Sequence, residues 1–259
     1  MPHVERHAHG AFCWPELATP DLAGAGAFYG ALLGWTAHAG AASGGTYVTF
    51  RLGGRDVGAA QAMNPGRLAG GVPPHWLPFV AVDDCDAAAA RVAAHGGTVL
   101  GAPWDLRDSG RLAIALDAVG APFGLWQARR HPGAGVLGDP GAMAWCQLNS
   151  GDPATAAAFY GAVFGWGARR DPMPGGGEYT TLTRGAEPAA GIMPMPPGLN
   201  APSHWLVYFA VADVNAAAAQ VAALGGATHV PPTDIPGMGR FSVHADPQGA
   251  TFALVRFAG

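Results

Sequence analysis

One stretch of the sequence occurs twice, at residues 14–35 and 145–166. Among the positions that carry the same residue 131 places later are Trp14, Leu17, Asp21, Ala27, Phe28, Tyr29, Gly30, Ala31, Gly34 and Trp35. A second correspondence, at a spacing of 129, begins at His75 and His204 and extends to Gly120 and Gly249. Because the spacing is constant over many residues, it indicates duplicated structure. The chain is therefore expected to consist of two tandem copies of one unit.

Composition narrows the classes of function. The net charge is −4 and no basic run is present, which argues against a nucleic-acid partner. No apolar stretch approaches the roughly 20 residues of a membrane span, and residues 1–10 lack a signal-peptide pattern, so we expect a cytoplasmic protein with a flexible N-terminal tail. Three cysteines, Cys13, Cys85 and Cys146, form no CxxC motif, which is typical of ordinary buried thiols.

Turn residues divide each half into two modules of the order βαβββ. In residues 11–66, a strand precedes Asp21, which can cap a helix, and Gly34 can end that helix. Gly53 and Gly54 then separate two further strand-like runs, as in a hairpin. Residues 75–127 repeat this order with another strand, helix and set of strands.

The predicted domains follow from these modules. Residues 128–142 are rich in Gly and Pro and are interpreted as a linker. The modules are predicted at residues 11–66, 75–127, 143–198 and 204–257, in domains 11–127 and 143–259. Because one module cannot bury its sheet face alone, pairs of modules are expected to enclose a concave cavity. The predicted fold class is α+β, with four βαβββ modules in two tandem domains.

This pattern resembles the vicinal oxygen chelate superfamily, which contains glyoxalase I, bleomycin-resistance proteins, fosfomycin-resistance enzymes and extradiol dioxygenases. The resemblance rests on the strand, the Pro-Asp turn, the helix and the FYG-x-x-x-GW run of residues 28–35, and on Asp246-Pro247-Gln248-Gly249. The Gly-rich run from Pro174, the run from Met193 to Gly198, and His204-Trp205 are similar to a two-domain actinobacterial group labelled "hydroxylase" or 27 kDa antigen-like. The resemblance implies two glyoxalase/bleomycin-resistance-type domains, each a curved open barrel around a cavity.

The resemblance also implies where a metal would be held. Metal-dependent members bind a divalent ion with His, Glu or Gln at four strand positions, since such ions need N or O donors that converge. The corresponding positions here are Trp14, the Ala59–Gln61 region, Leu77 and Gly124, and in the second half Trp145, the Gly191–Met193 region, Leu206 and Ala253. Only Gln61 among them could bind a metal, so neither metal nor cofactor is expected.

Alternation along the strands predicts a mainly aromatic wall with a few polar groups. The predicted ligand-binding residues are Phe12, Trp14, Glu16, His75, Leu77, Phe79, Trp126, Trp145, Gln147, Asn149, His204 and Tyr208. Glu16 and His75 are the candidates for a general acid–base pair, because a carboxylate at an inward position is costly unless it is used, paired or hydrated. The alternatives are that Trp14 and Trp145 fill the core and that the two histidines lie in loops. Trp76 and Trp205 are expected to pack against helices, and Arg111 and Arg240 to pair with Asp105 and Asp234.

Two hypotheses of function follow from this wall. The first is metal-independent binding of a hydrophobic, aromatic small molecule of natural-product or antibiotic type, by sequestration or in an accessory role, with a tailoring enzyme of the same pathway as a further partner. The second is a glyoxalase-like lyase or isomerase, or a hydroxylase-type enzyme, acting on such a metabolite. The sequence is compatible with a monomer or a homodimer.

Overall fold

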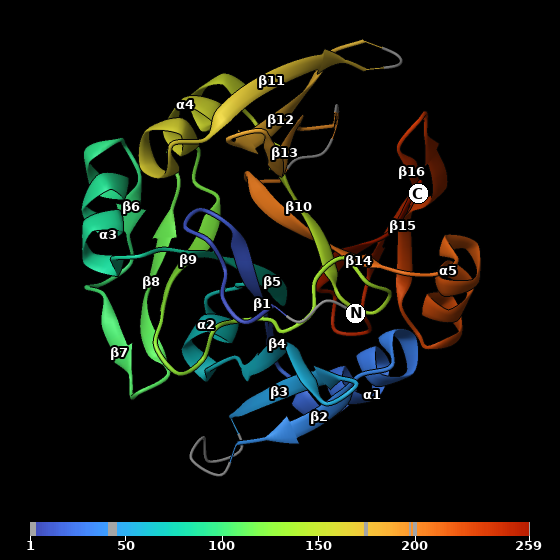
Figure 1. Ribbon diagram of the computed structural model, residues 1–259. Coiled ribbons are helices and arrows are strands. Elements are labelled where there is room, and N and C mark those ends of the chain that lie inside the picture. Colours follow the sequence, from blue (N-terminus) through green and yellow to red (C-terminus); the bar gives the residue numbers. More distant parts are fainter. Residues whose placement is uncertain (1–3, 41–45, 174–175, 197, 199–200, 259) are drawn as a thin grey trace.

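The computed structural model describes residues 4–40, 46–173, 176–196, 198 and 201–258. Each half of the chain forms one strongly curved sheet, and the helices lie around the outside (Figure 1). The strands of the first half are β1 (Phe12–Thr19), β2 (Thr36–Ala39), β3 (Tyr47–Leu52), β4 (Arg55–Ala62), β5 (His75–Ala81), β6 (Thr98–Val99), β7 (Trp104–Leu106), β8 (Gly110–Leu116) and β9 (Pro122–Ala128). Those of the second half are β10 (Met143–Ser150), β11 (Gly167–Pro172), β12 (Glu178–Arg184), β13 (Glu187–Pro194), β14 (His204–Ala210), β15 (Ala227–Ile235), β16 (Gly239–Ala245) and β17 (Thr251–Phe257). The helices are α1 (Leu22–Leu33), α2 (Pro65–Ala69), α3 (Cys85–Ala94), α4 (Pro153–Phe164) and α5 (Val214–Ala223).

The two sheets have the same topology. Their strand orders are β2-β3-β4-β1-β5-β9-β8-β6 and β11-β12-β13-β10-β14-β17-β16-β15. Within a module the first and last strands pair in parallel, and the two modules of a half join where β1 pairs antiparallel with β5, or β10 with β14. Both sheets are open, so the fold is two curved sheets built from four βαβββ modules.

The repeated stretch begins and ends its helix with the residues that the sequence indicates. The Asp21 side chain accepts a hydrogen bond from the Gly24 N–H, and Asp152 accepts from the Thr155 N–H in the same way. Each helix ends at a glycine in the left-handed region, with φ 75° at Gly34, where other residues would be strained. The predicted boundaries of these two helices are confirmed. They can be predicted from the sequence because each cap is formed by residues within one turn.

A bulge in β1 overturns the expectation that Phe12 shares a face with Trp14. The pairing register with β5 shifts between these two residues, so Cys13 and Trp14 both contact the apolar cluster on the concave face. Phe12 instead packs between the halves, against Trp166 and Trp205. Strand β10 has the same shift between Met143 and Trp145. The prediction that successive side chains alternate between the two faces of the sheet is therefore wrong at the start of β1 and of β10.

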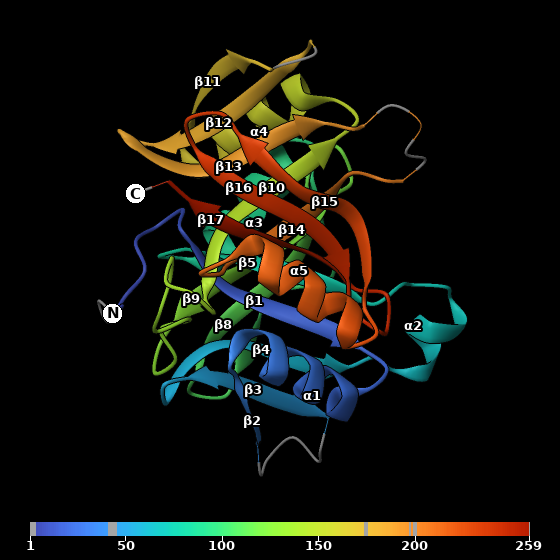
Figure 2. The same cartoon turned by 90° about the vertical axis from the view of Figure 1, so that its right-hand side faces the viewer.

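The halves are joined by the repeated motif itself. The Trp35 Nε1 donates to the Gly141 carbonyl oxygen over 2.6 Å, and the Trp166 Nε1 donates to that of Gly10 over 3.1 Å. One apolar core contains residues of both halves, and α1 lies beside α5 while α3 lies beside α4 (Figures 1 and 2). Each Trp thus binds the segment that precedes the first strand of the other half.

Residues 4–10 are packed against the rest of the chain, which differs from the expected flexible tail. His7 is buried and its Nε2 lies 2.9 Å from the Ala134 carbonyl oxygen, while the Val4 N–H donates to the carbonyl of Gly135. The predicted linker is therefore also the surface on which residues 4–10 lie. Residues 1–3 lie outside the described part of the chain.

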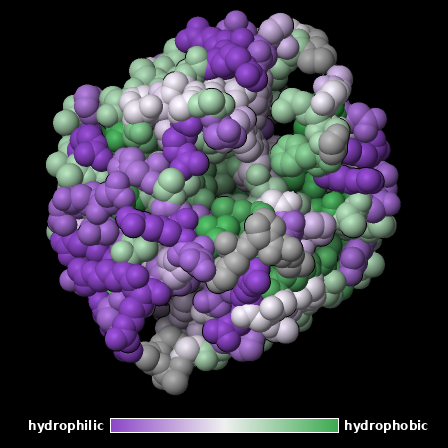
Figure 3. Space-filling view, viewed as in Figure 1, coloured by the Kyte–Doolittle hydropathy of each residue, from purple (hydrophilic) through white to green (hydrophobic). Residues whose placement is uncertain are grey.

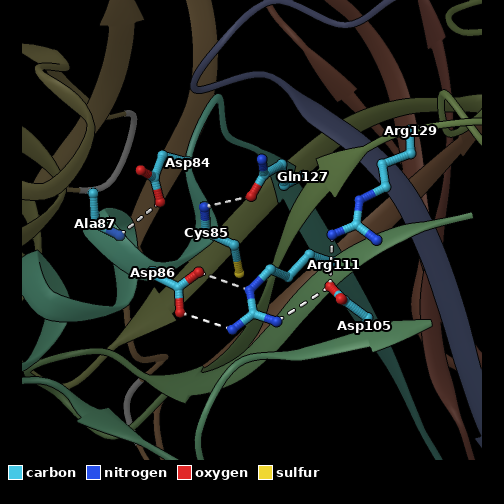
Figure 4. A network of polar contacts seen from close by, with 8 residues as sticks. All are labelled: Asp84, Cys85, Asp86, Ala87, Asp105, Arg111, Gln127 and Arg129. Carbon is cyan, nitrogen blue, oxygen red and sulfur yellow. Dashed lines mark hydrogen bonds and ion pairs between the residues drawn. The ribbon is translucent and has the colours of Figure 1, made fainter. Parts of the chain in front are cut away.

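Strand β7 and helix α2 were not expected from the sequence, and β7 belongs to a polar edge of the first sheet. Arg111 pairs with Asp86 through two N–H groups and also with Asp105, which in turn pairs with Arg129 (Figure 4). Arg240 pairs with Asp234 in the second half. These interactions confirm that both arginines form the expected ion pairs.

Candidate functional site

The concave face of the first sheet is lined by large apolar side chains. Its apolar cluster contains Cys13, Trp14, Ala59, Phe79, Ala81, Leu112, Trp126 and Ala134, with Tyr47, Leu77, Ile114 and Leu137 packed against it. We call this surface the first concave face. Strand pairing brings these residues together, since Trp14 lies opposite Phe79, and Phe79 lies opposite Gly124. The Phe79 ring occupies the space that a Cβ at Gly124 would need, so glycine there permits the ring to lie flat on the sheet.

Glu16 is the carboxylate of the first concave face. It lies opposite Ala59 on β4 and Leu77 on β5, and it is half-buried. Its carboxylate accepts a hydrogen bond from Tyr47, whose hydroxyl in turn interacts with Trp14. Burial raises the pKa of Glu16 to about 7, although the Tyr47 hydrogen bond and the positive charge of Arg67 act in the opposite direction. Glu16 therefore exists in both protonation states near neutral pH.

His75 lies on the same face as Glu16, but the two do not form the expected contact. His75 is paired with Ala18, two residues along β1 from Glu16. Its Nδ1 lies 2.8 Å from the Pro73 carbonyl oxygen, and its Nε2 lies 3.4 Å from NH2 of Arg67. Burial lowers the pKa of His75, so its ring is neutral at pH 7. Because Pro73 offers only an acceptor, the ring hydrogen is on Nδ1 and Nε2 carries the lone pair.

The concave face of the second sheet has a closed set of polar contacts. We call this surface the second concave face; its apolar members are Leu206, Tyr208, Ala253 and Val255, with Ala144, Trp145, Phe241 and Val243 packed against them. The Tyr208 hydroxyl donates to Gln147 Oε1 over 3.1 Å, and Gln147 Nε2 donates to Asn149 Oδ1 over 3.0 Å. Asn149 Nδ2 lies 3.1 Å from Nε2 of His204. Four side chains of this face are therefore joined in one row of hydrogen bonds.

The structure brings eleven of the twelve predicted ligand-binding residues to the two concave faces and separates only Phe12 from them. Whether they bind a ligand stays a prediction. Tyr47, Arg67 and Tyr179 also lie beside these residues and were not expected there from the sequence. Tyr47 and Tyr179 begin equivalent hairpins, and the Tyr179 hydroxyl accepts from Trp145 over 3.1 Å, so their recurrence was an available signal. Arg67 lies on a short helix in a Gly- and Pro-rich connection, for which the repeat gives no counterpart.

Two recesses border the concave faces. One of about 200 Å³ is lined by Trp145, Ala144, Leu137 and residues of β13. Another, of about 350 Å³, lies between residues 5–7 and the end of β9 and includes Trp126. Figure 3 shows hydrophobic side chains gathered in a hollow at the centre of one face of the molecule, bordered by hydrophilic ones. The larger recess is lined mainly by polar and charged residues, whereas the smaller one has a mainly apolar wall.

Comparison with known families accounts for this architecture. The family described as "Glyoxalase/Bleomycin resistance protein/Dioxygenase superfamily" matches residues 4–126 and again residues 142–254. The chain belongs to this superfamily. Each match covers one curved sheet, so the superfamily unit occurs twice, as the resemblance in the sequence predicted.

Two relatives in this superfamily share most of their length with the chain. The "Putative glyoxylase CFP32" of Mycobacterium tuberculosis (strain CDC 1551 / Oshkosh) is 40% identical over 258 residues, which cover 99% of this chain and 98% of the relative. The "Anthracycline biosynthesis protein DnrV" of Streptomyces peucetius is 35% identical, with 97% of this chain and 95% of the relative covered. Among solved structures, the Mn(II)-bound glyoxalase from Novosphingobium aromaticivorans has a TM-score of 0.68 at 18% identity, covering 95% of this chain and 82% of that one. That likeness concerns the fold alone.

The metal that this superfamily often carries does not fit the first concave face. The Nε2 of His75 faces the Arg67 guanidinium, whose positive charge would repel a divalent cation. Glu16 is engaged by Tyr47, and Leu77 and Gly124 offer no donor side chain. Across the ranges that the structure describes, no three His, Cys, Asp or Glu side chains are grouped so that they could hold a metal ion. Nor does any helix within those ranges have the length and apolar character to cross a membrane.

Proposed function

We propose that the first concave face binds a hydrophobic, aromatic small molecule without a metal ion. The observation that carries this proposal is the row from Trp14 through Tyr47 to Glu16, set in a wall that otherwise consists of Phe79, Trp126 and aliphatic side chains. Aromatic side chains offer stacking surface, and a single polar group can fix the orientation of a flat ligand.

The relatives support a ligand of natural-product type. DnrV carries the name of an anthracycline biosynthesis protein, and such a name fits an accessory or sequestering role for this chain in secondary metabolism. Within that role, a tailoring enzyme of the same pathway would be the protein partner. We place the function inside the cell because the three cysteines are free and buried.

Tryptophan fluorescence tests the proposal directly. Titration with planar aromatic metabolites is expected to quench emission in a saturable manner. Trp14→Phe should weaken binding, since it removes the indole N–H that interacts with the Tyr47 hydroxyl beside Glu16. The matched control is Trp104→Phe, because Trp104 is an exposed residue of the outer strand β7. Equal loss of affinity in both variants, or no saturable quenching by any planar aromatic compound, would refute the proposed site.

A second candidate function, catalysis, is favoured by the protonation state of Glu16. A carboxyl group whose pKa is about 7 is suited to accept and return a proton at neutral pH. The name of CFP32 points to the same class, a glyoxalase-like lyase or isomerase. Turnover of a bound compound that disappears in Glu16→Gln, while binding persists, would establish the enzyme. Binding with no turnover in either protein would leave the binding function.

A further inference from the structure

The two concave faces differ at a few equivalent positions. Glu16 of the first corresponds to Gln147 of the second, Ala18 corresponds to Asn149, and Phe79 corresponds to Tyr208. The histidines are retained, and each is paired across the strand with one of these residues: His75 lies opposite Ala18, and His204 lies opposite Asn149. The second half therefore has an amide side chain opposite its histidine, where the first half has only alanine.

In the second half, the side-chain amide of Asn149 bridges two neighbours. Its Oδ1 accepts from Gln147 Nε2 over 3.0 Å, and its Nδ2 lies 3.1 Å from His204 Nε2. The Nδ1 of His204 lies 2.9 Å from the Pro202 carbonyl, which can only accept, so the Asn149 N–H is directed at Nε2 of the ring. The bridge thus uses one acceptor and one donor, side by side.

In the first half, the histidine is held in the same way but the bridge is absent. Nδ1 of His75 lies 2.8 Å from the Pro73 carbonyl, which leaves the Nε2 lone pair directed elsewhere, as in His204. Ala18 supplies only a methyl group. The contact that Nε2 does make, with Arg67 at 3.4 Å, is longer than an ordinary N–H···N bond. Arg67 is exposed on α2, a helix with no buried residue, so a ligand could displace it into water.

We propose that the first concave face recognises its aromatic ligand through a carboxamide-like group, a carbonyl oxygen with an N–H or O–H donor beside it, which bridges Glu16 and His75 above Ala18. This inference rests on the proposed binding function and specifies the ligand for the same site. Protonated Glu16 donates to the carbonyl oxygen, as Gln147 Nε2 does to Asn149. His75 Nε2 accepts from the ligand donor, as His204 does from Asn149.

The remaining differences fit this arrangement. Glu16 holds a proton over a wider pH range than an ordinary carboxyl group because burial raises its pKa to about 7. The Tyr208 hydroxyl donates a hydrogen bond to Oε1 of Gln147, whereas Phe79, at the equivalent position, has no hydroxyl group to donate to Glu16. The apolar part of the ligand would then lie along Leu77 and the Tyr47 ring, which are half-buried, while Trp14 and Phe79 are buried beneath them.

A pair of probes that differ only in the bridging group tests the inference. 2-Naphthamide is expected to bind the native protein at least about tenfold more tightly than naphthalene, as judged by tryptophan quenching. Ala18→Asn should remove this preference, because its own amide would bridge Glu16 and His75. The control is Ala39→Asn on the edge strand β2, where the side chain is exposed and which β3 and β4 separate from β1.

The outcomes separate this inference from the function on which it rests. Equal affinity for both probes, or a preference that survives Ala18→Asn, would overturn the carboxamide-like group and leave aromatic binding intact. Failure of both probes to bind the native protein would overturn both proposals.

The reciprocal variant provides a second measurement. Asn149→Ala removes the bridge and leaves Gln147 and His204 with unmade hydrogen bonds, so it should lower the melting temperature. Acetamide, which reproduces the Asn side chain, should restore part of that loss. N,N-Dimethylacetamide, which has no N–H, should not. If the two compounds act alike on the variant, the bridge does not depend on the donor and the inference fails.

Discussion

Tyr29, on α1 in the first half, donates a hydrogen bond of 3.0 Å to the carboxylate of Asp246 in the second half. Its hydroxyl also accepts from the Trp76 Nε1 over 2.9 Å. The relationship is reciprocal, because Tyr160 of the second half donates to Asp117 of the first half over 2.9 Å. The tyrosine of the repeated FYG run therefore joins the halves rather than lining a concave face.

The first prediction concerns this tyrosine. Tyr29→Phe leaves the buried Asp246 carboxylate without its side-chain donor and Trp76 without its acceptor. The free energy of unfolding is expected to fall by about 1–3 kcal/mol, the usual cost of unsatisfied buried polar groups. Urea denaturation measures it. Tyr160→Phe serves as the internal replicate, and unchanged midpoints in both variants would contradict the structural role.

The second prediction concerns the pH dependence of stability. In the folded state the pKa of Glu16 is about 7, above the ordinary value of 4.5. The folded protein thus holds this proton more tightly than the unfolded chain. The stabilisation is complete below pH 4.5 and is lost as the pH rises through 7.

Glu16→Gln removes this titration. Between pH 5 and pH 8, the native protein should lose up to about 3 kcal/mol relative to the variant. Urea denaturation of both proteins at the two pH values measures this difference in the free energy of unfolding. The contributions of the other titrating groups cancel, because both proteins contain them. Parallel pH profiles would show that Glu16 titrates as an ordinary, solvated carboxyl group.

The parts of the fold that the sequence predicts are those decided locally or by repetition. Asp21 and Gly34 determine where α1 begins and ends through contacts within a turn. The four modules follow from residues that recur at a fixed spacing. The bulge between Phe12 and Trp14 has no such marker, and the rings that Phe12 contacts, Trp166 and Trp205, lie far away in the sequence.

The candidate site was predictable to a similar degree. Trp14, Glu16 and Leu77 follow from alternation along β1 and β5 beyond the bulge. The partners of Glu16 do not, since Tyr47 reaches it from β3, which is separated from β1 by β4 in the sheet. Arg67 lies on a helix too short to produce a periodic pattern.

The third prediction uses the close approach between Tyr179 and Gly191. A Cβ at Gly191 would collide with the hydroxyl and ring of Tyr179. Gly191→Ala must therefore displace Tyr179 and break its hydrogen bond with Trp145, at a cost of about 1–3 kcal/mol. Thermal unfolding and a change in tryptophan emission report the two effects. Gly151→Ala is the control, because a Cβ there makes only an ordinary contact, and an equal loss in both variants would contradict this explanation.

The fourth prediction concerns the cysteines, which the structure buries as the sequence indicated. Cys13, Cys85 and Cys146 are each at most 1% exposed, and none is in a disulfide. Burial raises the pKa of all three thiols, in the case of Cys85 to about 12, so almost no reactive thiolate exists at neutral pH. The native protein should therefore react with an aromatic disulfide reagent only as fast as it opens, whereas the unfolded chain should release three equivalents at once. An Ala39→Cys variant, with its thiol on an exposed strand, should show one additional fast equivalent. Only an accessible thiol can ionise and attack the reagent. A native cysteine that reacts as fast as the introduced thiol would therefore show that the segment carrying it opens without global unfolding, which would contradict the prediction.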